Sequence, residues 1–108
     1  MYKINGTTIT LTKGDSFYCQ LSLKKGTQAF TPSEGDVIKF GLKEHFWDAE
    51  ALIEKVIPND TLVLAILPAD TEDLAVGTYC YDIEYTSLGG DVDTFINNQQ
   101  FNLVPEVI

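Results

Sequence analysis

The chain has 108 residues, a hydrophobic content of 44% and a formal net charge of −9, so we expect one folded acidic domain over residues 1–108. The acidic balance argues against nucleic acid and anionic membranes as partners, because both require Lys and Arg to displace counterions. No apolar run approaches the ~20 residues that a membrane-spanning helix requires, and the N-terminus shows no secretion-signal pattern. We therefore expect a cytoplasmic protein.

Short stretches of alternating apolar and polar residues recur along the chain, and each is typical of a half-buried strand. They cover Thr8 to Leu11, Ser16 to Leu23, Val37 to Lys43, Leu52 to Ile57, Thr61 to Leu67, Tyr79 to Tyr85 and Val92 to Val104. Asn5-Gly6 predicts a hairpin or a kink before the first strand, and Asn97-Asn98 suggests a bulge in the last. About seven strands and no long helix predict an all-β, immunoglobulin-like Greek-key sandwich.

A compact crossover is predicted between Thr61 to Leu67 and the Tyr-rich strand. Pro68 has no N–H to donate, so it ends the strand ladder and suits the first turn of a helix. Tyr79 and Tyr81 then share one face of the next strand. At the corresponding corner of immunoglobulin-like sandwiches, a Tyr hydroxyl bonds back to backbone upstream. Tyr79 is the candidate for this structural corner, and Tyr81 is the second choice.

Alternation also predicts which side chains are buried. Ile38, Phe40 and Leu42 should face the core, and Lys39 should face away. Cys19 shares the apolar face of its strand, whereas Cys80 shares the polar face. Their Cβ atoms should therefore not converge as a disulfide requires, and a cytoplasm keeps thiols reduced, so we expect two free thiols.

Three motifs suggest a family. The run Leu67 to Ile83 reads Leu-Pro-x-Asp-Thr-x-x-Leu-x-x-Gly-x-Tyr-x-Tyr-Asp-Ile, and Leu11 to Phe17 reads Leu-Thr-x-Gly-Asp-x-Phe. The chain closes on a hairpin at Gly90-Asp91 and on Phe-x-x-x-x-Glu-Val from Phe101 to Val107. In order and spacing these motifs resemble the N-terminal domain of the baseplate upper protein of phages that infect Gram-positive bacteria.

The resemblance covers nearly the whole chain and implies a structural role rather than the catalysis of a reaction. It implies a virion structural or assembly domain, associated with the tail or baseplate, that binds other tail proteins or itself. Such a protein would be found in the cytoplasm of the bacterial host during assembly and then in the virion.

Residues suited to catalysis or cofactor binding are sparse. The single histidine, His45, has no partner cluster at metal-ligand or relay spacing, and neither a nucleophile elbow nor a phosphate loop is present. Asp91 and Asp93, joined by Asp82 or Glu84 from a paired strand, could hold Ca²⁺. A solvated acidic face that prevents edge pairing is the favoured interpretation. We therefore predict no enzyme, no cofactor and no metal site.

The segment Glu44 to Glu50 is irregular and contains the aromatic cluster His45, Phe46 and Trp47. If exposed, this cluster would be a hot spot for a protein partner or a stacking platform for a sugar. If folded back, it would cap the sandwich edge, which is favoured because a lone Trp is usually mostly buried. These three residues are the candidate partner-binding site of an assembly domain. The alternative function is a glycan- or cell-surface-binding module.

Overall fold

A computed structural model describes residues 2–25 and 28–106 of the chain. The strands are β1 (Tyr2–Asn5), β2 (Thr8–Thr12), β3 (Phe17–Gln20), β4 (Lys24–Lys25), β5 (Gln28–Ala29), β6 (Val37–Lys43), β7 (Ile53–Ile57), β8 (Val63–Ile66), β9 (Gly77–Thr86) and β10 (Val92–Val104). A single helical turn, α1 (Pro68–Thr71), connects β8 to β9 within the described residues. Over those same ranges, none of the helical structure has the length and apolar character that crossing a membrane would require.

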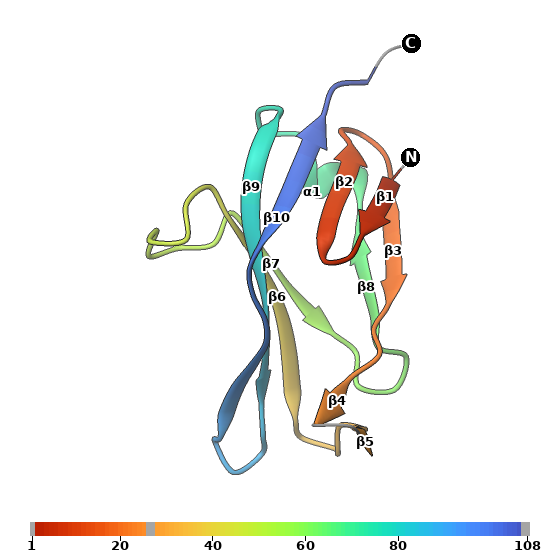
Figure 1. The fold of residues 1–108 in the computed structure, drawn as a ribbon, viewed down its shortest axis with the longest axis vertical. Helices are drawn as coiled ribbons and strands as arrows, with labels where there is room; N and C mark the ends of the chain where they lie inside the picture. The colour runs from red at the N-terminus through yellow and green to blue at the C-terminus, as the bar shows by residue number, and fades with distance from the viewer. Residues whose placement is uncertain (1, 26–27, 107–108) are drawn as a thin grey trace.

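The fold is all-β and consists of a large mixed sheet and a smaller second sheet. The large sheet has the order β1-β2-β10-β9-β6-β7, and it is mixed because β2 runs parallel to β10 while the other neighbours are antiparallel. The second sheet pairs β3 with β8, and β4 pairs with β5 in a short ribbon. The large sheet curls, and β3 and β8 lie across its inner face (Figure 1).

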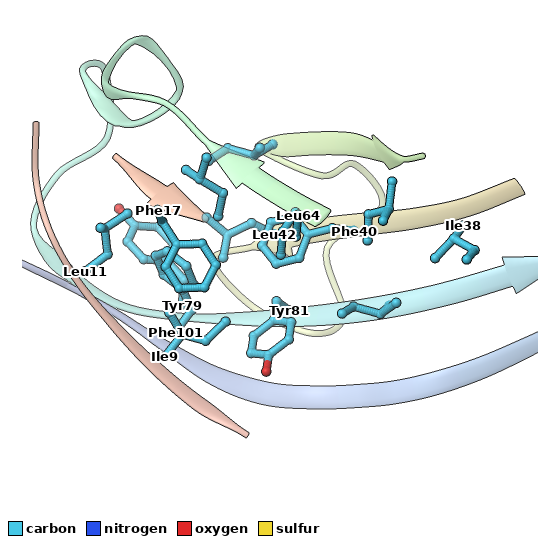
Figure 2. Packing of buried hydrophobic residues seen from close by; sticks show 14 of the residues in the cluster. Ile9, Leu11, Phe17, Ile38, Phe40, Leu42, Leu64, Tyr79, Tyr81 and Phe101 are labelled. Atoms are coloured by element: carbon cyan, nitrogen blue, oxygen red, sulfur yellow. The ribbon is translucent and has the colours of Figure 1, made fainter. Parts of the chain in front are cut away.

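The core fills the space between these two sheets, as Figure 2 shows for side chains from both. Ile38, Phe40 and Leu42 of β6 are fully buried, which confirms the predicted register of that strand. Lys39 faces solvent, where its Nζ lies 2.9 Å from Glu54 Oε1. On β9 the residues Tyr79, Tyr81, Ile83 and Tyr85 are likewise buried.

The two cysteines are free, as predicted. Both are half-buried, and burial raises the pKa of each thiol. Cys80 lies on the outer face of β9, where its Sγ is 3.5 Å from the carbonyl oxygen of Lys43. Cys19 contacts the core from β3, so the two thiols are on different faces of the structure.

The crossover between β8 and β9 forms the expected helical turn. Pro68 begins α1, and Asp70 Oδ2 accepts a hydrogen bond from Leu67 N at 2.7 Å. The Tyr79 hydroxyl donates to the carbonyl oxygen of Ala75 at 2.5 Å, which is the bond back to the crossover predicted for this residue. The Tyr81 hydroxyl instead donates to the carbonyl oxygen of Thr7 in the β1–β2 turn.

The predicted bulge in the last strand is confirmed. The register between β10 and β9 shifts on either side of Ile96, and Asn98 has a positive φ of 50°. Asp82 Oδ1 accepts a hydrogen bond from the backbone N of Asn98 at 2.5 Å, so a side chain of β9 satisfies an amide that the bulge displaces. Phe95 and Ile96, although consecutive, both pack against the core.

The second predicted strand, Ser16 to Leu23, is too long. Observed β3 ends at Gln20, because its partner β8 begins only at Val63 and the preceding Leu62 has a φ of 54°, outside strand geometry. Leu21 still donates a backbone hydrogen bond to Leu62 at 2.7 Å. Beyond that bond the chain leaves the small sheet and continues into the β4–β5 ribbon.

Asp36 connects the C-terminal end of β9 to the loop before β6, and it is only 9% exposed. Its Oδ2 accepts from the Tyr85 hydroxyl and from Ser33 N, both at 2.8 Å, and its Oδ1 accepts from Leu88 N at 3.0 Å. A hydrogen bond from Tyr85 to Asp36 raises the pKa of that tyrosine. The carboxylate thereby ties the β9–β10 hairpin loop to the loop that enters β6.

Replacing Phe40 by Ala should lower the free energy of unfolding by about 3–5 kcal/mol, because a fully buried ring is lost and a cavity remains. The neighbouring Lys39→Ala change should stay within about 0.5 kcal/mol, since its ion pair is exposed. Chemical denaturation measures both. Equal losses at the two positions would contradict the register of β6.

Replacing Asp36 by Asn should lower the free energy of unfolding by about 1–3 kcal/mol, because one acceptor oxygen becomes an N–H donor beside groups that also donate. Asp93→Asn is the matched control, since Asp93 is exposed on β10 and should change stability by about 0.5 kcal/mol or less. Denaturation curves with the same midpoint for Asp36→Asn and the unmodified protein would show that the Asp36 bonds are dispensable.

Candidate functional site

The loop between β6 and β7, residues 44–52, is held in shape by Asp48 and is called the aromatic loop below. Asp48 Oδ2 accepts a hydrogen bond from His45 N at 3.0 Å, and Asp48 N donates to the carbonyl oxygen of His45 at 3.0 Å. Lys43 Nζ, at the end of β6, donates to the carbonyl oxygen of Asp48 at 2.8 Å. A hydrogen bond between an Asp side chain and the backbone a few residues away is common in tight turns. The turn from His45 to Asp48 is therefore fixed to the end of β6.

The fixed turn presents its three aromatic side chains together. The His45 and Trp47 rings stack with centroids 4.5 Å apart and planes 12° apart, and Phe46 meets Trp47 edge to face at 5.0 Å. Trp47 is 68% exposed and Phe46 is 63% exposed. His45 Nδ1 lies 3.6 Å from Asp48 Oδ2, an ion pair when the imidazole is protonated. Trp47 therefore contacts both other rings, and the three form one exposed cluster.

The favoured expectation that Trp47 folds back over the sandwich edge is wrong. The turn closes between His45 and Asp48, so Trp47 packs against its own loop and does not reach the core. His45 is a solvent-facing loop residue, since its side chain is 47% exposed. The structure thus holds the aromatic cluster in the exposed arrangement, the one in which it is available to a partner.

An open hollow of about 270 Å³ lies between the aromatic loop and the outer face of the large sheet. It is lined by Glu44, His45, Phe46 and Trp47 from the loop, Thr78, Tyr79 and Cys80 from β9, and Asn98, Gln99 and Gln100 from β10. Aromatic rings thus form one wall, and side chains that can donate and accept hydrogen bonds form the other. Such a surface can stack against a ligand and also fix its orientation.

The side chains that line the hollow offer aromatic faces and hydrogen-bonding groups. Cys80 is the thiol that lines it, and burial, together with the nearby Asp82 and Asp48 carboxylates, raises its pKa. A thiol that stays protonated is a poor nucleophile. In the described part of the chain, no group of three or more His, Cys, Asp or Glu side chains could hold a metal ion.

The acidic residues considered for Ca²⁺ are not brought together. The register between β9 and β10 places Asp93 opposite Tyr85 and Thr94 opposite Glu84. Side chains directly opposite each other in a sheet share a face, so Asp93 and Glu84 project from opposite faces. Asp82 is engaged with the Asn98 bulge. Neither Asp82 nor Glu84 therefore joins Asp93 on one face, as the Ca²⁺ site would require.

Sequence reasoning missed the β10 side of the hollow. The pair Asn97-Asn98 signals a bulge, but its relation to the aromatic loop depends on the register, which sets Gln100 opposite Cys80 on the outer face. A period-two pattern gives the face of a strand and not its partner. Pairing across β9 is what brings these amides to the aromatic loop.

Comparison of the chain with protein-family models, with curated proteins and with solved structures finds no match.

Proposed function

We propose that the chain is a non-catalytic interaction domain that assembles with other proteins of a phage or prophage tail or baseplate. It does so through the aromatic loop and the adjoining outer face of β9 and β10. The observation that carries this proposal is the exposure of Trp47 and Phe46 on a turn that Asp48 holds in place. In this account the domain acts in the cytoplasm of the bacterial host during assembly and then in the virion.

Physical considerations favour a protein partner for this surface. Trp is among the residues most enriched at interface hot spots, and rigid aromatic groups lose little conformational entropy on binding. The surrounding carboxylates Glu44 and Glu50 are exposed and would form a polar rim, since charged residues are depleted at interface centres. The net charge of −9 would discourage self-association and favour a basic partner surface.

The arrangement of strands supports an immunoglobulin-like Greek-key sandwich as the finer description of the fold. The first long strand, β2, lies parallel to the last, β10, and β9 lies between β10 and β6. The hydrogen bond of Tyr79 to Ala75 corresponds to the tyrosine corner of such sandwiches. Together with the order of motifs that resembles the baseplate domain, this supports placing the chain in a tail or baseplate.

Glycan binding is the second candidate, and the composition of the hollow favours it. Stacking of an aromatic ring on a sugar, combined with hydrogen bonds from amide side chains, is a general way to hold a carbohydrate. Asn98 and Gln100 provide such amides beside Trp47. In that case the same surface would bind a cell-surface oligosaccharide in place of a tail protein.

Trp47→Ala should fold normally, with stability changed by about 0.5 kcal/mol, because the ring contacts chiefly its own loop. It should weaken binding to a tail-protein partner by about 30-fold, the effect of losing a 2 kcal/mol hot spot. Co-purification with proteins encoded by neighbouring tail genes, followed by calorimetry, measures this. Tyr18→Ala is the matched control, since Tyr18 is an exposed aromatic residue (54%) on β3.

A Trp47→Ala protein that binds its partner as tightly as the unmodified chain would contradict the proposal. Trp47 is the sole tryptophan of the chain, so its fluorescence reports on this site alone. Quenching of that fluorescence by an oligosaccharide, with no tail protein captured, would instead establish the glycan-binding function.

A further inference from the structure

Two adjoining hollows lie between β10 and the segment that continues β3. One, of about 230 Å³, is lined by Leu21, Ser22, Leu23, Ile83, Phe95 and Ile96. The other, of about 110 Å³, shares three of these residues and extends toward Phe17 and Leu64. Ser22 is exposed whereas Phe17 and Leu64 are buried, so the two hollows run from the surface into the sandwich; together they are called the side cavity. Because protein interiors leave few voids larger than a water molecule, a space of this size is a candidate ligand site.

The lining of the side cavity is apolar. No Asp, Glu, Lys, Arg or His is among the described residues that line it. The Tyr81 hydroxyl, from the inner part of the lining, already donates to the carbonyl oxygen of Thr7. A charged or strongly polar ligand would lose its hydration there without gaining hydrogen-bond partners. In comparison, an engineered cavity of roughly 150 Å³ lined by Leu, Ile and Phe stays dry and binds benzene.

The stretch of β10 beside the cavity is too irregular to pair with an added strand. Its register with β9 shifts on either side of Ile96, and Asn98 has a φ of 50°. The backbone N of Asn98 bonds to Asp82 Oδ1, and the carbonyl oxygen of Asn97 accepts from Gln99 Nε2 at 2.9 Å. Strand addition requires evenly repeated N–H and C=O groups. The occupant is therefore a molecule that enters the cavity, and neither an extended peptide nor a second copy of the chain.

We propose that the side cavity binds a small molecule with an aliphatic chain and an uncharged polar end. The chain would lie along Leu21, Ile83 and Ile96, which line both hollows. The polar end would stay in water beside Ser22, an exposed hydroxyl at the rim. Since the space runs from the rim to the core, it suits a chain more than a compact ring, and each CH₂ group that enters it leaves water favourably.

n-Hexanol serves as the probe, titrated into the full chain with ¹³C-labelled isoleucine δ1 methyl groups. The methyl resonances of Ile83 and Ile96, which line the cavity, should shift saturably, whereas those of the buried Ile38 and Ile57 on β6 and β7 should not. Binding should strengthen by about fourfold for each CH₂ from n-pentanol to n-hexanol to n-heptanol, the gain for a fully buried methylene. A hexanediol with a hydroxyl at each end should bind about tenfold or more weakly than n-hexanol, because its inner hydroxyl finds no partner.

Two variants should block the cavity. Leu21→Trp should weaken n-hexanol binding by about tenfold or more, because the larger ring takes up space that both hollows share. Ser22→Trp acts at the exposed rim and should also weaken binding, and it keeps the test decisive where Leu21→Trp does not fold. Ser16→Trp, the same change at an exposed serine outside the cavity, should bind n-hexanol like the unmodified chain.

The site is separate from the aromatic loop, so Trp47→Ala should bind n-hexanol unchanged, and the proposed function does not depend on this result. Absence of saturable shifts, shifts spread over all isoleucine methyl groups, or an affinity that does not change with chain length would overturn the proposal and leave the hollows as empty packing voids. Unweakened binding by folded Leu21→Trp and Ser22→Trp would also overturn it. Loss of n-hexanol binding in Trp47→Ala would place the alcohol at the aromatic loop and contradict the assignment to the side cavity.

Discussion

Three tyrosine hydroxyls on the inner face of β9 connect separate segments of the chain to the core. Tyr79 bonds to the crossover at Ala75, Tyr81 to the β1–β2 turn at Thr7, and Tyr85 to the Asp36 carboxylate. Each ring is buried while its hydroxyl reaches a segment outside the β9 ladder, a division that suits the apolar ring and polar end of Tyr. Burial raises the pKa of Tyr81 to about 12, so this hydroxyl remains a donor even at an alkaline pH near 10, where a free tyrosine is half ionised.

The same period-two geometry leaves the outer face of β9 available for binding. Because the tyrosines point inward, Thr78 and Cys80 point outward and form the floor of the hollow beside the aromatic loop. Within the loop, Asp48 bonds to the backbone of His45, and Trp47 is exposed on the turn that these bonds close.

The sequence predicts the strands and their buried faces well, because alternation in Val37 to Lys43 and Tyr79 to Tyr85 reports burial directly. It also predicts the Asn97-Asn98 bulge and the Pro68 turn from local residue chemistry. Prediction from the sequence fails where a contact depends on how strands far apart in the chain pair with each other. The bonds of Asp36, the Asn98 contact of Asp82 and the amides beside Trp47 all depend on register between strands. Exposure of Trp47 depends on the hydrogen bonds that fix the turn from His45 to Asp48, which no periodicity reveals.

Native-state hydrogen exchange on the Tyr79→Phe, Tyr81→Phe and Tyr85→Phe proteins tests the claim that each β9 tyrosine holds its own segment. Each change removes one hydroxyl and keeps the ring. We expect amide exchange to rise by about two- to tenfold, the range for a single hydrogen bond, in a different segment each time: the crossover after α1, the β1–β2 hairpin, and the amides of Asp36 and Leu88. Exchange that rises uniformly across the chain in all three variants, or in none, would contradict the claim.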